Sequence, residues 1–301
     1  MERKLRIGTR GSPLALIQAQ AVASALKQKH NVDHELVIIK TSGDQTLKPL
    51  AKIGGKGLFV KEIDYALLES KIDLAIHSAK DLPAMTDEKI KLHSILPREA
   101  QADCFISKHS FADFQKLSGV KIGTCSIRRK RQLLAYNPNL IIHELRGNVN
   151  TRLAKLAALE YSAIIIAKAA LNRLKLNLSE YICNSLTEDI MLPSLAQGAL
   201  ACSYLDSKIF ELTQDLINED NEIRFKAERA FLKELKADCS LPIAGKVQVV
   251  KDQLDFKVKI YQSNGIIQHR LQSKIGDEQN LGIALAKKVL ADSRYQLLAE
   301  N

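Results

Sequence analysis

Several residue types and patterns are scarce in this chain of 301 residues. Tryptophan is absent, and aromatic residues make up only 5% of the sequence. Cysteine occurs five times, an odd number in which no two positions have Cys-x-x-Cys spacing, at Cys104, Cys125, Cys183, Cys202 and Cys239. This usage argues against a disulfide-bonded scaffold and against a zinc knuckle. We therefore expect a reduced protein of the cytoplasm with no metal site.

Long apolar runs are also missing. Ala163–Ala167 is among the longest, far below the roughly 20 residues that span a bilayer. The segment Met1–Gly11 carries charge but lacks the apolar core of a secretory signal. The composition, with 46% hydrophobic and 26% charged residues, is typical of a globular protein. We expect neither a membrane span nor a membrane partner.

The charge is unbalanced, with 44 Lys and Arg against 34 Asp and Glu, a net charge of +10. Such an excess indicates an anionic partner, either a nucleic acid or a small ligand that carries carboxylates or phosphates. No basic stretch is interleaved with aromatic residues, and residues 121–152 contain no recognisable nucleic-acid motif. A small anionic ligand is the preferred hypothesis, and no nucleic-acid partner is expected.

Apolar periodicity predicts alternating strands and helices up to about residue 218. The predicted strands are Leu5–Gly8, Glu35–Ile39, Ile72–Ile76, Lys91–Leu96, Val120–Gly123, Leu140–Glu144 and Ala163–Ala167. The predicted helices follow Ser12 as N-cap or span Leu58–Ser70, Ser126–Tyr136, Asn148–Leu159 and Ala169–Leu174. This alternation favours parallel sheets in two similar α/β halves.

The pattern of apolar and polar residues changes after about residue 218. A strong helix is predicted over Asn221–Leu235 and a final helix over Leu281–Leu298. Between them, Val247–Val250, Leu254–Tyr261 and Ile266–Gln272 alternate apolar and polar residues. The tail is predicted to be an α+β unit with a small antiparallel sheet, which makes three domains in all.

Arginines gather at the predicted junctions between strands and helices. Arg10 precedes an N-cap, and Arg128 and Arg129 open a helix. Arg146 ends a strand, and Arg152 lies one turn into the helix that follows. Ligands of open α/β sheets bind beyond the carboxyl ends of the strands, where arginine forks can hold carboxylates. We interpret the pattern as a site for several carboxylates. An ordinary solvated face is the alternative for any single arginine.

Three further segments could carry chemistry. His77-Ser78-Ala79-Lys80-Asp81 follows a buried strand, so Asp81 is placed for acid–base work or for stabilising a cation, although a turn or cap role is also open. Glycines in 43–57 suit a mobile lid or an anion-binding loop. Cys239 lies in a loop and could be a nucleophile or an attachment point, or simply apolar filler.

Taken together, these segments resemble the porphobilinogen deaminases, also called hydroxymethylbilane synthases. The matching motifs, in order, are Arg-Gly-Ser-Pro-Leu-Ala-Leu at 10–16, Lys-Ile-Gly-Gly-Lys-Gly-Leu-Phe at 52–59, His-Ser-Ala-Lys-Asp at 77–81, Gly-Thr-Cys-Ser-Ile-Arg-Arg at 123–129, Leu-Arg-Gly-Asn-Val-Asn-Thr-Arg at 145–152, Leu-Pro-Ser-Leu-Ala-Gln-Gly-Ala at 192–199, and Cys239 before Pro242-Ile243.

The resemblance implies a fold of three domains. Two α/β domains like those of periplasmic binding proteins would enclose a central cleft, and the third would be α+β. Domain 1 would comprise residues 1–97 and 197–217, with the catalytic Asp and the lid loop. Domain 2 would comprise residues 98–196, and domain 3 residues 218–301 with the Cys239 loop.

The resemblance also implies the activity. Members of this family are transferases of tetrapyrrole and haem biosynthesis that condense four porphobilinogen molecules head to tail, release ammonia and yield hydroxymethylbilane. A dipyrromethane cofactor, joined by a thioether to Cys239, primes the chain. Each pyrrole carries an acetate and a propionate, so roughly twelve carboxylates would need cations. A monomer is expected.

Site residues carry over position by position. Asp81 would be the catalytic carboxylate and would stabilise the cationic azafulvene left when ammonia departs. The cofactor would be bound, besides Cys239, by Lys80, Asp81, Ser126, Arg128, Arg129 and Arg146. The substrate would be bound by Arg10, Ser12, Lys56, Ser78, Thr124, Arg152, Arg173 and Gln197. Arg98 and Asp103 lie near the crossing between the first two domains, with hinge or site roles.

The sequence departs from the family's pattern at four places. Cys125 stands where Ser is usual, Asn150 and Ala196 replace glycines, and Lys236-Ala237-Asp238 precedes Cys239 where glycines are common. An anion-binding module without chemistry is the alternative function, but it would leave Asp81 and Cys239 without a role.

Overall fold

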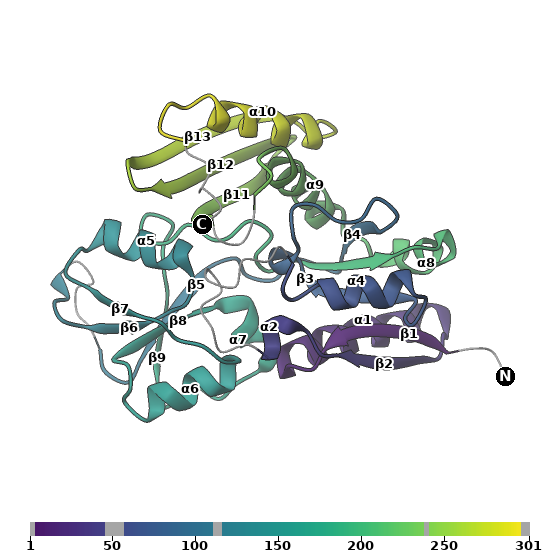
Figure 1. Cartoon of the computed structure of the whole chain (residues 1–301), viewed down its shortest axis with the longest axis horizontal. Helices are drawn as coiled ribbons and strands as arrows, with labels where there is room; N and C mark the ends of the chain where they lie inside the picture. The colour runs from purple at the N-terminus through teal and green to yellow at the C-terminus, as the bar shows by residue number, and fades with distance from the viewer. Residues whose placement is uncertain (1–3, 46–56, 111–115, 238–240, 296–301) are drawn as a thin grey trace.

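The computed structural model describes residues 4–45, 57–110, 116–237 and 241–295. Its strands form three sheets, which we call the first, second and third sheet. In Figure 1 the first sheet lies at the right, the second at the left and the third at the top. The predicted fold class, two α/β units followed by a small antiparallel α+β unit, is confirmed.

The first sheet has the strand order β2-β1-β3-β10-β4. Its strands are β1 (Leu5–Arg10), β2 (His34–Ile39), β3 (Leu74–Ser78), β4 (Lys91–Ile95) and β10 (Leu200–Tyr204). Its helices are α1 (Pro13–His30), α2 (Ser42–Gln45), α4 (Lys61–Leu68), η1 (Ala79–Asp81), α8 (Ser207–Thr213) and η3 (Gln214–Leu216). The predicted N-cap of α1 is confirmed, because the Ser12 hydroxyl accepts a hydrogen bond from the Ala15 amide at 3.3 Å.

The second sheet repeats this arrangement with the order β7-β6-β8-β5-β9. Its strands are β5 (Asp103–Ser107), β6 (Lys121–Gly123), β7 (Ile141–His143), β8 (Ala163–Ala167) and β9 (Ile182–Ser185). Its helices are α5 (Ile127–Tyr136), α6 (Val149–Ala157) and α7 (Lys168–Leu174).

The prediction of parallel sheets is wrong in part. In the first sheet β10 runs antiparallel to both neighbours, β3 and β4, and in the second sheet β5 runs antiparallel to both β8 and β9. Apolar runs show that a strand is buried but carry no information about its direction. Strands β5, β9 and β10 were not predicted, and β3 begins two residues later than expected, at Leu74.

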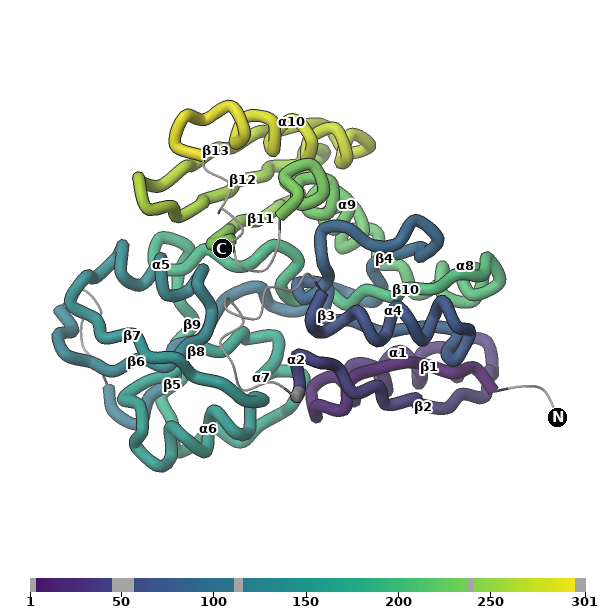
Figure 2. The backbone as a smooth tube through the Cα atoms, in the orientation of Figure 1, coloured from purple at the N-terminus to yellow at the C-terminus, as the bar shows by residue number. Residues whose placement is uncertain are grey.

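The antiparallel strands arise because the chain crosses twice between the two sheets. Residues 96–102 lead from β4 to β5, and residues 186–199 lead back from β9 to β10 (Figure 2). The two crossing segments touch, since the Glu99 amide donates to the Gly198 carbonyl at 3.1 Å. A Cβ on Gly198 would lie 2.1 Å from the Glu99 carbonyl oxygen, and φ there is +88°. Only glycine fits this contact.

The third sheet has the order β11-β12-β13, with β11 (Ile243–Val250), β12 (Gln253–Gln262) and β13 (Gly265–Lys274) all antiparallel. Helices α9 (Glu219–Glu234) and α10 (Glu278–Leu290) pack on this sheet, where Phe231 of α9 and Leu285 of α10 share one apolar core with Phe256 of β12. A Cβ on Gly282 would lie 2.3 Å from the Ala227 carbonyl oxygen, so these two helices pack backbone to backbone. The final helix ends at Leu290, earlier than predicted.

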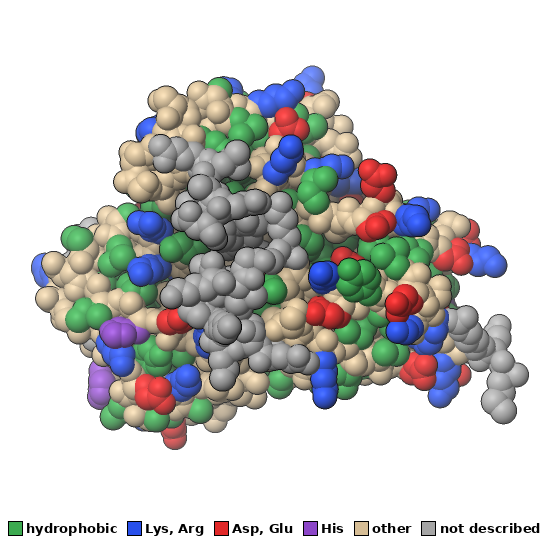
Figure 3. Space-filling view, in the orientation of Figure 1, with side chains coloured by type: hydrophobic (Ala, Val, Ile, Leu, Met, Phe, Trp, Pro, Cys, Tyr) green, Lys and Arg blue, Asp and Glu red, His purple; other side chains and the backbone are tan. Residues whose placement is uncertain are grey.

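The surface carries charges of both signs. On the face shown in Figure 3, Lys and Arg side chains are interspersed with Asp and Glu, so the excess positive charge does not gather into one basic patch there. Among the described helices, none combines the length and the apolar character needed to cross a bilayer. The predicted site residues are instead concentrated between the first and the second sheet.

Candidate functional site

The first sheet presents Lys80 and Asp81 at the end of β3. The single turn η1 follows Ser78 directly, and the Gln18 side-chain amide of α1 donates to the Ser78 hydroxyl at 2.9 Å. The backbone of η1 is tied to the returning chain, because the Ala79 amide donates to the Ala199 carbonyl at 3.1 Å. Lys80 and Asp81 are therefore held at a fixed edge of the sheet.

His77 precedes this edge and is structural. It is buried, and its Nε2 lies 2.8 Å from the Ser203 hydroxyl of β10. Burial, together with the charges of Arg10 and Arg229, lowers the pKa of His77 to about 4. A neutral imidazole that is already hydrogen-bonded contributes packing, not proton transfer, at neutral pH.

The second sheet presents Arg128 and Arg129 at the start of α5. The Ser126 hydroxyl caps this helix by accepting from the Arg129 amide at 3.4 Å, and the Thr124 hydroxyl accepts from the Ser126 amide at 3.2 Å. Both Arg side chains run inward, and each residue is 6% exposed. The predicted roles of Thr124 and Ser126 as ligands remain predictions, since both hydroxyls also shape the turn.

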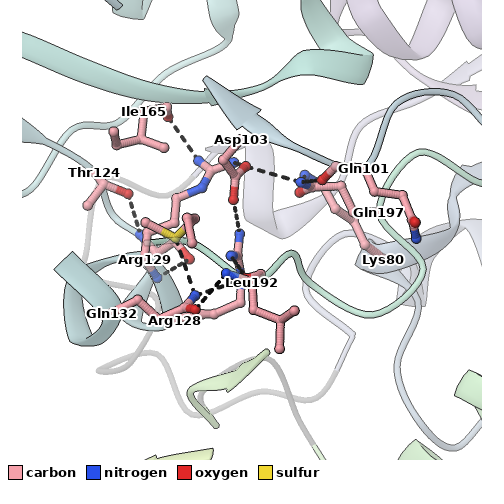
Figure 4. Close-up of polar contacts among 12 residues, drawn as sticks. Lys80, Gln101, Asp103, Thr124, Arg128, Arg129, Gln132, Ile165, Leu192 and Gln197 are labelled. Atoms are coloured by element: carbon pink, nitrogen blue, oxygen red, sulfur yellow. Dashed lines mark hydrogen bonds and ion pairs between the residues drawn. The ribbon is translucent and has the colours of Figure 1, made fainter. Parts of the chain in front are cut away.

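The two arginines share one buried carboxylate, Asp103, the first residue of β5 (Figure 4). Arg128 Nη2 lies 2.7 Å from Asp103 Oδ2, and Arg129 Nη2 lies 2.7 Å from Oδ1. Although burial opposes ionisation, the charges of Arg128 and Arg129 hold the pKa of Asp103 well below its usual range. The Asp103 carboxylate thus holds the guanidinium groups of Arg128 and Arg129 close to each other.

The outer guanidinium nitrogens of these arginines are also fixed. Arg128 Nη1 donates to the Leu192 carbonyl at 2.8 Å, and Arg129 Nη1 donates to the Ile165 carbonyl at 2.9 Å. Carbonyl oxygens are neutral acceptors, so they orient the arginines without cancelling their charge. The cluster keeps an excess of positive charge.

Gln197 connects this cluster to the first sheet. Its side-chain amide donates to Asp103 Oδ1 at 3.1 Å, and its Oε1 accepts from Lys80 Nζ at 3.1 Å (Figure 4). Burial, with a contribution from the charge of Arg129, lowers the pKa of Lys80 to about 8. A residue of the returning crossing segment therefore links the cations of the two sheets.

Asp81 interacts electrostatically with Arg152 of the second-sheet unit. Burial lowers the pKa of Arg152 in α6, and the negative charge of Asp81 acts against that shift, as it does for Lys80. Arg152 itself is oriented by the Gly147 carbonyl, to which its Nε donates at 2.8 Å, and its Nη2 lies 3.7 Å from the Cys125 sulfur. The aspartate thus lies within electrostatic reach of cations from both sheets.

The remaining predicted residues are distributed differently. Arg10 forms a bidentate ion pair with Asp44 of α2, and its guanidinium lies 4.2 Å from the centre of the Phe59 ring. Arg146 donates to Glu144 at 2.8 Å, and Arg173 donates to the Gly198 carbonyl at 2.6 Å. Cys239, Lys56 and most of the expected lid, residues 46–56, lie outside the described residues.

Arg98 joins the outgoing crossing segment to α9. Its guanidinium pairs with both oxygens of Glu228, at 2.9 and 3.0 Å, and its Nε donates to the Gln197 carbonyl at 2.9 Å. Both side chains are almost completely buried, 3% exposed for Arg98 and 0% for Glu228. The helix that leads toward Cys239 in sequence is therefore anchored beside the cluster.

Two protein-family models match the chain. Residues 5–209 match the model described as porphobilinogen deaminase, dipyromethane cofactor binding domain, and residues 223–291 match the porphobilinogen deaminase C-terminal domain. The chain belongs to the porphobilinogen deaminase family. Together the two matches take in all three sheets, so the whole described architecture is that of the family.

Curated relatives agree. Porphobilinogen deaminase of Macrococcus caseolyticus is 40% identical over 95% of this chain and 94% of its own length. That of Geobacter sulfurreducens is 42% identical over 99% of this chain and 94% of its own length. Among solved structures, a periplasmic binding protein of Salmonella typhimurium is 14% identical with a TM-score of 0.41, covering 77% of this chain and 93% of that one.

Three partners of the predicted cations were not assigned from the sequence. Asp44 and Glu228 were not singled out, and Asp103 was noted only for its place near the crossing. A signal for Asp103 was present, since an acidic residue directly precedes the apolar run Cys104-Phe105-Ile106. Such a charge next to a buried strand must find a cation.

Proposed function

We propose that this chain condenses four porphobilinogen molecules head to tail, with release of ammonia, to give hydroxymethylbilane. The supporting observation is the joined cluster of Lys80, Gln197, Asp103, Arg128 and Arg129, with Asp81 beside it. Lys80, Arg128 and Arg129 around Asp103 leave an excess of two positive charges, and Arg152 offsets the charge of Asp81. Carboxylate side chains of pyrroles are the ligands that such a surplus suits.

The donor set fits the family's dipyrromethane group. Guanidinium and ammonium groups bind carboxylates, and Arg128, Arg129, Lys80 and Arg152 supply four of them from both sheets. When bound through a thioether to Cys239, this group supplies the pyrrole carbon to which the first substrate is joined. We assign Arg146, Ser126 and Asp81 to the same binding surface.

Substrate carboxylates would be held by the outlying cations and by polar groups near them. These are Arg10, Ser12, Lys56, Ser78, Thr124, Arg152, Arg173 and Gln197. Arg10 is paired with Asp44 in the structure, so a substrate carboxylate would take the place of Asp44 on the guanidinium. Arg10 would then keep an ion pair, with a substrate carboxylate in place of Asp44.

Asp81 carries the catalytic step in this proposal. As the substrate loses ammonia, positive charge develops on its pyrrole nitrogen, and a carboxylate within a few ångströms stabilises that charge. The same carboxylate can accept a proton when the new bond between rings is complete.

Replacing Asp81 with Asn tests this role. Because the amide keeps the size but loses the charge, we expect turnover to fall about 100-fold or more while the fold and the attached group persist. Asp87→Asn, at an exposed carboxylate in the same segment, is the matched control and should leave turnover near normal. Turnover of Asp81→Asn within a few-fold of the control would remove Asp81 from the mechanism.

Attachment is tested separately by Cys239→Ser. Intact-protein mass spectrometry should show the wild-type mass raised by a dipyrromethane unit and the variant at its bare mass. A variant that carries the same added mass would place the thioether elsewhere. We further propose that the enzyme is monomeric and cytoplasmic, with domains of residues 1–97 with 197–217, 98–196 and 218–301.

A further inference from the structure

Two cysteines that the proposed reaction does not use lie side by side in the second sheet. Strands β5 and β9 pair antiparallel, with Cys104 opposite Ser185 and Ile106 opposite Cys183. Alternate residues of a strand share a face, so Cys104 and Cys183 are diagonal neighbours on one face. The register therefore places Cys104 and Cys183 next to each other across the strand pair.

Polar neighbours favour a thiolate at this pair. The Cys104 sulfur lies 3.8 Å from the Ser185 hydroxyl, and that hydroxyl accepts from Lys168 Nζ at 3.1 Å. Hydrogen bonds from Cys183 and Ser185, with the charge of Lys168, lower the pKa of Cys104 to about 7, although burial and Asp103 oppose this. The interaction with Cys104 raises the pKa of Cys183.

The two sulfurs differ in access. Cys104 is 1% exposed, whereas Cys183 is exposed to solvent. Strand β9 is the edge strand of its sheet and contains four residues, so only β5 restrains it within the sheet. A small reagent would meet Cys183 first, and a bond between the sulfurs requires β9, an edge strand, to move relative to β5.

We propose that Cys104 and Cys183 form a reactive dithiol that small disulfides of the glutathione type oxidise to an intramolecular disulfide. Cys183 gives its proton to the Cys104 thiolate, and the Cys183 thiolate so formed attacks one sulfur of the reagent, which releases one thiolate as the leaving group. Cys104 then loses its proton and attacks the Cys183 sulfur of the mixed disulfide, which releases the second thiolate. The protein loses two electrons and two protons, and the reagent becomes two thiols.

The position of this pair connects it to the candidate site. Asp103, the counter-ion of Arg128 and Arg129, directly precedes Cys104 in β5. A bond at Cys104 would act on the strand that holds the arginines together. This location distinguishes the pair from Cys202, which is buried and whose pKa burial raises above its ordinary value.

Oxidation of the full-length protein by oxidised glutathione tests the proposal. We expect the protein to lose two hydrogen atoms in intact mass, to release two thiols per chain, and to yield a peptide that joins Cys104 to Cys183. Cys183→Ser should form no internal bond and leave Cys104 unmodified, because Cys104 is buried. Cys125→Ser, the control at the other cysteine of the second-sheet unit, should oxidise like the wild type.

Two results would overturn the proposal. One is a stable glutathione adduct on Cys183 while Cys104 still reacts with an alkylating reagent after unfolding, because the second step would then have failed. The other is a Cys183 that remains a free thiol under conditions that oxidise a small dithiol, because the pair would then have no special reactivity.

Discussion

Replacing Asp103 with Asn removes the charge that holds Arg128 and Arg129 together. The amide keeps the shape of the side chain and can still accept one hydrogen bond at its oxygen. Its nitrogen, however, would face an arginine donor, so one guanidinium loses its hydrogen bond and both are left buried without an anion. We expect a large loss of stability from this change of a few atoms.

The magnitude follows from burial. The side chain of Asp103 is 0% exposed, and those of Arg128 and Arg129 are 7% exposed. Breaking a buried ion pair by removing one partner costs about 3–5 kcal/mol. The pair between Asp255 and Arg270 is also bidentate, but Arg270 is 62% exposed, and an exposed pair contributes about 1 kcal/mol or less. Asp255→Asn is therefore the matched control.

Urea unfolding at neutral pH, followed by circular dichroism, measures the free energy of unfolding of both variants. Because the arginines lower the pKa of Asp103, its contribution is present above the unfolded value of roughly 3.9 and is lost as the pH falls below it. The difference from wild type should stay constant from pH 8 to pH 5 and shrink in stronger acid. A loss for Asp103→Asn no larger than that for Asp255→Asn would refute the account of the cluster.

Two further predictions concern Ala196 and Lys80. Ala196 has φ of 57° where the family usually has glycine. Because a left-handed conformation costs a non-glycine residue about 1–2 kcal/mol, Ala196→Gly should stabilise the protein by about 0.5–1 kcal/mol. The change in Tm measures this gain. Ala201→Gly, in the buried strand β10, should instead destabilise it, and a loss in both variants would contradict the strain argument. Lys80 has a pKa of about 8 without ligands, so loading of the apo-protein with its pyrrole group should weaken as the pH rises through 8. Lys80→Arg keeps its charge and should remove that pH dependence; an unchanged profile would assign the titration to another group.

Local signals in the sequence predicted the junction residues well. Ser12 caps α1 as predicted, and Arg128 and Arg129 open α5 as expected. Capping and helix periodicity depend on neighbours within one or two turns, which a sequence displays directly. The antiparallel tail was predicted for the same reason, since its strands follow one another through short turns.

Long-range pairing could not be predicted in this way. Strand β10 pairs with β3 although about 120 residues separate their centres in sequence, and nothing local in Leu200–Tyr204 indicates which strands it meets. Asp44 on Arg10 and Glu228 on Arg98 are similar cases, separated by 34 and 130 residues. A charge pattern shows that each cation needs a partner, but only the topology selects which carboxylate it meets.

The two crossing segments explain why the cluster and the arrangement of the sheets depend on the same residues. Arg98 and Asp103 bracket the outgoing segment, and Gln197 lies on the returning one. Gln197 accepts from Lys80 of the first sheet and from Arg98 through its carbonyl, while it donates to Asp103 of the second. Any change in the angle between the two sheets must therefore move the acceptor shared by Lys80 and the anion shared by the arginines. The Gln197 side chain therefore joins a cation of the first sheet to the anion of the second.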